Sequence, residues 1–166
     1  FMEKKGEMKL SFGMIFSIIM IIIFISFAFY AIQKFLSIQN TAQAAKFVSD
    51  LQNDVDKMWR GSQGSQKQEY FLPSGVRYVC FADYKKSEMG ERQSFYDELN
   101  QAYYEEENLF FYPIGSGEGF DSVNLKNVDI EKTTEENNPE CFENIKGKVI
   151  FTLKKDFNEA LVTISE

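Results

Sequence analysis

The chain has 166 residues, a formal net charge of −7, no histidine and two cysteines. The length fits one folded domain, and the acidic balance argues against nucleic acid as a partner. Because the usual general base and the commonest transition-metal ligand are both missing, we expect no enzyme activity, no cofactor, no metal centre and no small-molecule substrate.

The first predicted element is an apolar helix. No charged residue stands between Lys9 and Lys34, and 14 of the 23 residues from Leu10 to Ile32 are Ile, Leu or Phe. At 1.5 Å per residue this helix is roughly 35 Å long, enough to cross a hydrocarbon core of about 30 Å. A buried core helix and a cleaved signal peptide are the alternatives. The run is longer than a signal peptide core of about 7 to 15 residues, so we predict a retained transmembrane helix over residues 10–33.

The flanking lysines predict the orientation of this span. Lys4, Lys5 and Lys9 precede it, whereas only Lys34 and then Lys46 follow it closely. Positive charge is retained on the cytoplasmic side, which predicts a cytoplasmic segment over residues 1–9 and a single-pass protein of the cell membrane. Residues 35–166 would then lie outside the cell, where they carry 14 Lys and Arg against 23 Asp and Glu, a net charge of −9.

A helical period continues beyond the span. Apolar residues recur mostly three and four positions apart, at Phe35, Leu36, Ala42, Ala45, Val48, Leu51, Val55 and Met58. This pattern predicts an amphipathic stem helix over residues 34–60 that buries one stripe against a globular head. Residues 31–60 contain neither Pro nor Gly, so span and stem form one predicted helix, which Gly61 ends.

The head, residues 61–166, changes to a mixture of short elements. Residues 67–72 and 76–84 form a predicted hairpin around Pro73-Ser74-Gly75, and both faces of residues 76–83 carry some apolar area. Further along come a helix over 91–105, a strand over 109–114, a flexible glycine loop over 115–119 and a strand-like segment over 120–130. Residues 131–140 are predicted to lie on the surface, and strands over 147–154 and 160–165 close the head. The prediction is an α+β fold in which the long N-terminal helix packs on a small antiparallel β-sheet.

The two cysteines, Cys80 and Cys141, both lie in the predicted outer part. An even number of cysteines in an oxidising compartment favours a disulfide. Two buried free thiols are the alternative.

Other residues are weaker candidates for a site. Trp59 either covers the core beneath the first strand or acts as a surface anchor for a partner. The aromatic run Tyr103, Tyr104, Phe110, Phe111 and Tyr112 fits core and sheet packing better than a binding surface. Glu105-Glu106-Glu107 and the pair Asp50 and Asp54 could bind a hard cation, but the Asp pair is also an ordinary helix-surface arrangement.

The stretch Lys4-Lys5-Gly6-Glu7-Met8 ahead of the apolar run, with the stem that follows, resembles the type IV pilin superfamily, its archaeal branch in particular. The resemblance covers about residues 4 to 60 and implies a class III signal peptide cut between Gly6 and Glu7 on the cytoplasmic side. It also implies a pilin-like head and assembly into a surface filament. The position at which bacterial pilins carry a glutamate is Ser11 here. The chain is similar as well to uncharacterised single-span archaeal membrane proteins, which implies no activity.

Two hypotheses follow for the function. One is a structural subunit or minor pseudopilin, whose partners are the lipid bilayer and other pilin-like subunits held through small residues of the helix. Because lipid gives no hydrophobic drive between spans, association depends on such residues, and the candidates are Gly13, Ser17, Ala28 and Ala31. The other hypothesis is a monomeric envelope protein whose head binds a protein or a glycan.

Overall fold

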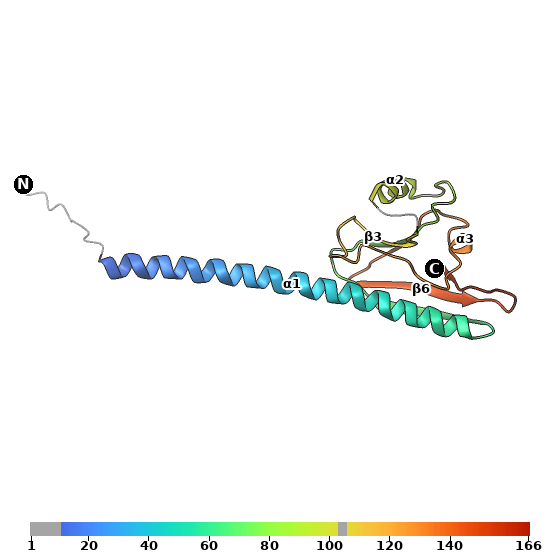
Figure 1. Ribbon diagram of the computed structural model, residues 1–166, viewed down its shortest axis with the longest axis horizontal. Helices are drawn as coiled ribbons and strands as arrows, with labels where there is room; N and C mark the ends of the chain where they lie inside the picture. The colour runs from blue at the N-terminus through green and yellow to red at the C-terminus, as the bar shows by residue number, and fades with distance from the viewer. Residues whose placement is uncertain (1–10, 103–105) are drawn as a thin grey trace, which may run out of the picture. The chain divides into compact units, whose positions relative to one another are not determined.

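The computed structural model describes residues 11–102 and 106–166 of the chain. Contacts divide the chain into two compact units, Phe1–Ile38 and Gln39–Glu166. Within them lie three helices and seven strands that the structure describes, in the order shown in Figure 1. The fold class is α+β, with a long apolar N-terminal helix and a small antiparallel domain, as the sequence predicts.

Helix α1, Phe12–Arg60, is 49 residues long. Its sequence from Met14 onward has no Gly or Pro to interrupt the backbone hydrogen bonds. The helix ends where Gly61 follows, and the Gly61 amide donates to the carbonyl of Met58 at 3.1 Å. The predicted end of the helix at residue 60 is therefore confirmed.

The stem part of α1 buries one stripe in the second unit. The buried residues are spaced three and four apart, as a helix face requires: Ala44, Phe47, Leu51 and Val55. The Phe47 ring lies 5.5 Å from the Tyr70 ring and 5.6 Å from the Phe111 ring, measured between centroids. The predicted stripe is correct at Leu51 and Val55. It is wrong at Phe35, Leu36 and Ala42, which are exposed.

One sheet lines the main core with its inward face. It consists of β1 (Gly64–Phe71), β6 (Lys148–Lys155) and β7 (Thr163–Ser165) in the order β1-β6-β7, all antiparallel. Alternation along β6 sends Val149, Phe151 and Leu153 inward, each fully buried. The C-terminal pair of strands was predicted and is confirmed.

The other sheet is buried on both faces. Its order is β4-β3-β2-β5, from β4 (Ser122–Val123), β3 (Leu109–Tyr112), β2 (Tyr78–Phe81) and β5 (Glu140–Glu143). One face joins the main core with α1 and the first sheet. The opposite face forms a second cluster of buried residues with Leu99 of helix α2, Gln93–Ala102. In Figure 1, α2 lies on the side of β3 away from β6.

The predicted hairpin of residues 67–72 with 76–84 is wrong. β1 pairs with β6 along its whole length, and β2 lies between β3 and β5 in the other sheet. The Leu72 amide donates to the carbonyl of Gly147, after which the turn at Pro73 takes the chain from one sheet to the other. The physical reason is the apolar character of both faces of β2, because such a strand is stable only where both faces are covered.

Two further predictions need correction. In the segment 120–130 only Ser122–Val123 is a strand, and the short helix α3, Ile130–Thr133, begins at its end. The segment 131–140 is not all surface, since Thr133, Thr134 and Asn138 are at most 5% exposed. The Asn138 side chain accepts from the Asp83 amide at 3.0 Å and donates to the Asp83 carbonyl at 2.8 Å. A polar side chain is stable in the interior when its hydrogen bonds are satisfied in this way.

The end of α1 is held by a lysine from the other end of the chain. Lys155, the last residue of β6, is 9% exposed, and its Nζ donates to the carbonyls of Trp59 and Gly61. Helix C-termini present carbonyls without intrahelical partners and carry partial negative charge. Lys155 therefore satisfies both requirements and joins α1 to the sheet.

We expect Lys155→Met to destabilise the folded chain by about 2 kcal/mol, since it removes two hydrogen bonds from a charged, largely buried donor to partly buried carbonyls. Lys154→Met is the matched control. Lys154 is exposed and pairs with Asp156 on the surface, so its loss should cost no more than about 0.5 kcal/mol. Urea unfolding of the full chain in detergent, followed by Trp59 fluorescence, measures both. Equal losses in the two variants would contradict the capping role.

Candidate functional site

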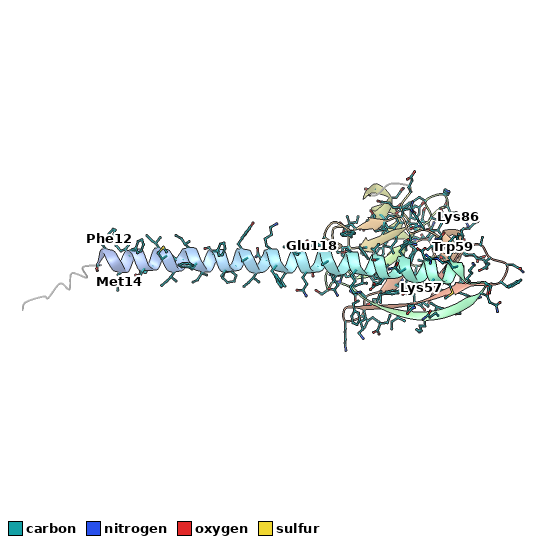
Figure 2. The ribbon with its side chains drawn as sticks, turned by 60° about the horizontal axis from the view of Figure 1, so that its bottom comes forward. Phe12, Met14, Lys57, Trp59, Lys86 and Glu118 are labelled. Carbon is teal, nitrogen blue, oxygen red and sulfur yellow. A yellow bond between two sulfur atoms is a disulfide. The ribbon has the colours of Figure 1, made fainter. Side chains whose placement is uncertain are left out.

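The largest unassigned feature of the structure is the bare apolar surface of α1 in the first unit. From Phe12 to Ile38 large apolar side chains are exposed, with Ile22 at 58% and Phe27 at 67%. Figure 2 shows side chains around Phe12 and Met14 projecting from the helix into open space. An exposed apolar patch on a soluble monomer rarely exceeds a few hundred Å². This surface has to be shielded from water by something other than the described part of the chain.

Length and composition make α1 able to cross a membrane. Its most apolar window has no residue buried in the structure, and among the described residues it is the one helix that meets both conditions. Two hydroxyl groups in this stretch bond to the helix itself. Ser17 Oγ donates to the carbonyl of Gly13, and Ser26 Oγ to that of Ile22, each at 2.8 Å. The helix therefore satisfies its polar groups internally, as hydrocarbon surroundings require.

The four predicted packing residues fall on one side of the helix. With 3.6 residues per turn, Gly13, Ser17, Ala28 and Ala31 lie within about 60° of one another around the helix axis. All four are exposed. A Cβ placed on Gly13 would meet only Ser11 Oγ, at 3.8 Å. Nothing in the folded chain therefore requires a glycine at this position.

The predicted processing site, Gly6 and Glu7, lies outside the described residues. So do Tyr103, Tyr104 and Glu105. Of the rest of the aromatic run, Phe110 and Phe111 are fully buried on opposite faces of β3, and the Tyr112 ring stacks on Phe95 at 3.8 Å between centroids. These three residues serve core and sheet packing, as the sequence favours.

Cys80 and Cys141 form a disulfide, as predicted, and the alternative of two free thiols is wrong. The two residues stand opposite each other on β2 and β5 and are buried in the cluster beneath α2. The bond therefore joins the central strand of this sheet to its edge strand.

Trp59 is 41% exposed. Its two predicted roles, a cover over the core and a surface anchor for a partner, both stay predictions.

Asp50 and Asp54 are both engaged with side chains of their own unit. Lys46 pairs with Asp50 at 2.7 Å, and Lys57 pairs with Asp54 at 2.9 Å. The Tyr70 hydroxyl also donates to Asp54 at 3.1 Å. Burial raises the pKa of Tyr70, and the Asp54 carboxylate raises it further. Within residues 11–102 and 106–166, no three His, Cys, Asp or Glu side chains are grouped as metal ligands.

Sequence reasoning missed a polar hollow in the head, here called the acidic hollow. It measures about 490 Å³ and is lined by Glu91, Arg92, Lys132, Thr133, Glu135, Glu136, Asn137, Pro139, Glu140, Cys141, Thr163, Ile164, Ser165 and Glu166. The residues come from the edges of β5 and β7, from α3 and from the segment before α2. The density of glutamates in 131–140 was the available signal, but only the tertiary fold brings Glu91 and β7 beside them.

The acidic hollow contains two cations, and each has a partner. Arg92 donates to the carbonyl of Cys141 at 3.3 Å and lies over the Tyr78 ring, 4.7 Å from its centroid. Lys132 pairs with Glu159. Glu91, Glu135 and Glu136 form no ion pair with any residue in the described part of the chain. The acidic hollow therefore has an excess of uncompensated negative charge.

No family model, no curated protein and no solved structure matches this chain.

Glu140, in the wall of the acidic hollow, yields a prediction about pH. Burial raises the pKa of its carboxyl group, Glu166 and Glu136 add to the rise, and a hydrogen bond from Asn137 opposes it. A carboxyl whose pKa is higher in the folded state stabilises the fold at low pH, and this contribution is lost as the pH rises through the folded pKa. Charged Glu140 is therefore unfavourable at neutral pH.

We expect Glu140→Gln to raise the melting temperature at pH 7, with the gain shrinking as the pH falls through the raised folded-state pKa and vanishing below about 4.3, where a glutamate is protonated in the unfolded chain as well. Glu143→Gln, at an exposed position on the same strand, should change little at either pH. Thermal unfolding followed by circular dichroism at several pH values measures the difference. A loss of stability at pH 7 in Glu140→Gln would contradict the assigned direction.

Proposed function

We propose that this chain is a membrane-anchored, pilin-like assembly subunit, a major subunit or minor pseudopilin of an archaeal surface filament. The observation that carries the proposal is the bare apolar surface of α1 from Phe12 to Ile38. Such a surface is stable in lipid or against other apolar helices, and a filament core of packed helices provides the second environment. The proposed role is structural: the chain is anchored in the membrane and joins other subunits, with no chemical step.

The stripe of small residues supports association between copies. In lipid, helices associate through close packing, because the hydrocarbon around them is as apolar as their own side chains. Gly13, Ser17, Ala28 and Ala31 let another helix approach the backbone along one side of α1. Phe and Ile side chains around the stripe add contact area.

Two observations support the proposed orientation, with the N-terminus in the cytoplasm and residues 35–166 outside. The lysines at positions 4, 5 and 9 fit retention on the inner side. The disulfide Cys80–Cys141 fits an oxidising compartment for the head, since such bonds are rare in the cytosol.

A second candidate is a monomeric single-span envelope protein whose head binds a protein or a glycan. The exposed Trp59 and the acidic hollow favour it, because each offers a surface for a ligand. The two candidates differ in the state of the span. The monomer predicts single chains in the bilayer, and the filament subunit predicts contacts between spans.

Processing provides the first test. If the chain matures as pilins do, N-terminal sequencing of the protein purified from its native host should find Glu7 as the first residue. Electron microscopy of the same preparation should show filaments. Intact chains that begin before Gly6 would contradict processing and leave the monomeric anchor as the better account.

Self-association of the span provides the second test. We expect the double substitution Gly13→Leu, Ser17→Leu to weaken association of the full chain in lipid vesicles by about 1 to 2 kcal/mol, because bulky side chains prevent close approach. Energy transfer between labelled chains measures it. Ser26→Leu is the matched control, since Ser26 is exposed, bonds to its own helix as Ser17 does, and lies on another side of α1. Equal effects of the two changes would argue against the stripe.

A further inference from the structure

A second uncovered surface lies on the head, on the face of the β1-β6-β7 sheet that points away from the core. Phe71 and Lys148 stand opposite each other on β1 and β6, and the Lys148 ammonium lies 5.2 Å from the centroid of the Phe71 ring. Ile150 follows two residues along β6 and so shares this face. Ile145 exchanges backbone hydrogen bonds with Lys148 just before the strand.

This basic–apolar patch, defined as Phe71, Ile145, Lys146, Lys148 and Ile150, is unusual for the head that carries it. Its three apolar members are exposed by 60%, 62% and 45% for Phe71, Ile145 and Ile150. Two lysines lie among them, in a head whose net charge is −9 over residues 35–166. Lys148 pairs at 2.7 Å with Glu69, which stands opposite Ile150 on the same face, whereas Lys146 forms no ion pair in the described part of the chain. Apolar area rimmed by polar residues is typical of a surface that meets a partner.

The acidic hollow of the same chain has the complementary character. Its carboxylates at Glu91, Glu135 and Glu136 form no ion pair in the described part of the chain, although the charge of Glu135 acts on the nearby Lys86. Met89 stands at its rim, 43% exposed, because its backbone exchanges hydrogen bonds with Asn138, next to the lining residue Asn137. The acidic hollow thus offers negative charge beside an exposed apolar side chain.

We propose that the basic–apolar patch of one copy docks on the acidic hollow of a second copy. Charge complementarity selects this occupant. Two heads of net charge −9 repel each other in most orientations, and this pairing sets Lys146 and Lys148 against a hollow in which glutamates outnumber cations. It also covers Phe71, Ile145 and Ile150 with the rim at Met89.

The two surfaces are separate, which decides the geometry of the contact. The patch lies over β1 and the first residues of β6, whereas β7, which lines the acidic hollow, pairs with the last residues of β6 on its other side. A contact between two different surfaces of identical chains is heterologous, and it extends into an open chain unless a rotation closes it into a ring. The proposal deepens the proposed function by naming a head-to-head contact for the assembling subunit.

Such a contact need not be strong. Anchoring both copies in one bilayer raises their effective concentration, so a weak head contact adds to contacts between spans. Surface charge pairs contribute little individually. Complementary charge acts mainly on orientation and partner choice, which is the property that a regular array needs.

The test separates the heads from the spans. The full chain is placed in lipid nanodiscs of zwitterionic lipid at one chain per disc, so that spans cannot meet and any association of discs reports the heads. Sedimentation velocity over a range of concentrations should show wild-type discs associating at about 50 mM salt and separating at about 500 mM, where charges are screened within a few Å.

Charge reversal then identifies the surfaces. Lys146→Glu with Lys148→Glu reverses the patch, and Glu135→Lys with Glu136→Lys reverses the acidic hollow. Each double variant alone should associate at least about tenfold more weakly, because like charges then face each other. An equal mixture of the two should associate again, since the intact hollow of one variant meets the intact patch of the other. Lys46→Glu with Lys126→Glu is the control for the patch variant, with the same change of net charge at exposed positions that belong to neither surface.

Wild-type discs that stay single at every concentration would overturn the contact. So would reversed variants that associate as the wild type does, or a control that loses association equally. None of these results bears on the association of spans measured in vesicles, so the head contact and the proposed function fail separately.

Discussion

One constraint governs this protein: the apolar surface of α1 between Phe12 and Ile38 has to be kept from water. At about 25 cal/mol per Å², a helix side of several exposed Ile and Phe side chains represents many kcal/mol of unfavourable hydration. In the described part of the chain, the most apolar window of α1 has no buried residue. Lipid or neighbouring helices therefore complete the structure. The remaining properties of the chain are those of a head that must fold beside such a helix.

The part of α1 that belongs to the head forms one side of the main core. Phe47, Leu51 and Val55 pack into the main core, and Lys155 holds the carbonyl end of the helix. One continuous helix thus enters two environments with different demands. Before residue 39 the apolar residues are on all sides, and after it they form one stripe with charged residues opposite. Because the backbone hydrogen bonds run through without a break, the helix itself links the two units.

Much of this could be read from the sequence, and the failures have a common cause. Local signals placed α1 and its end at residue 60, the helix near Phe95 and Leu99, the short strand at Phe110 and the strands at either side of Phe157. Strand pairing was wrong where it depended on distant partners, since β1 pairs with β6 across the length of the head. The apolar character of both faces of Tyr78–Phe81 was visible in the sequence. It should have argued against a two-stranded hairpin, because a hairpin leaves one face in water.

The acidic hollow shows the same limit for a site. Glu91, the 131–140 segment and β7 are separated in sequence, and each resembles ordinary solvated surface when taken alone. They become a site only because Asn138 ties the 83–87 loop to its own segment and Thr133 Oγ1 accepts from the Ile164 amide. Buried polar residues in a segment that is otherwise exposed thus hold these distant segments together by hydrogen bonds. In a small acidic head, such hydrogen bonds determine where uncompensated negative charge accumulates, and so where another molecule of opposite charge can bind.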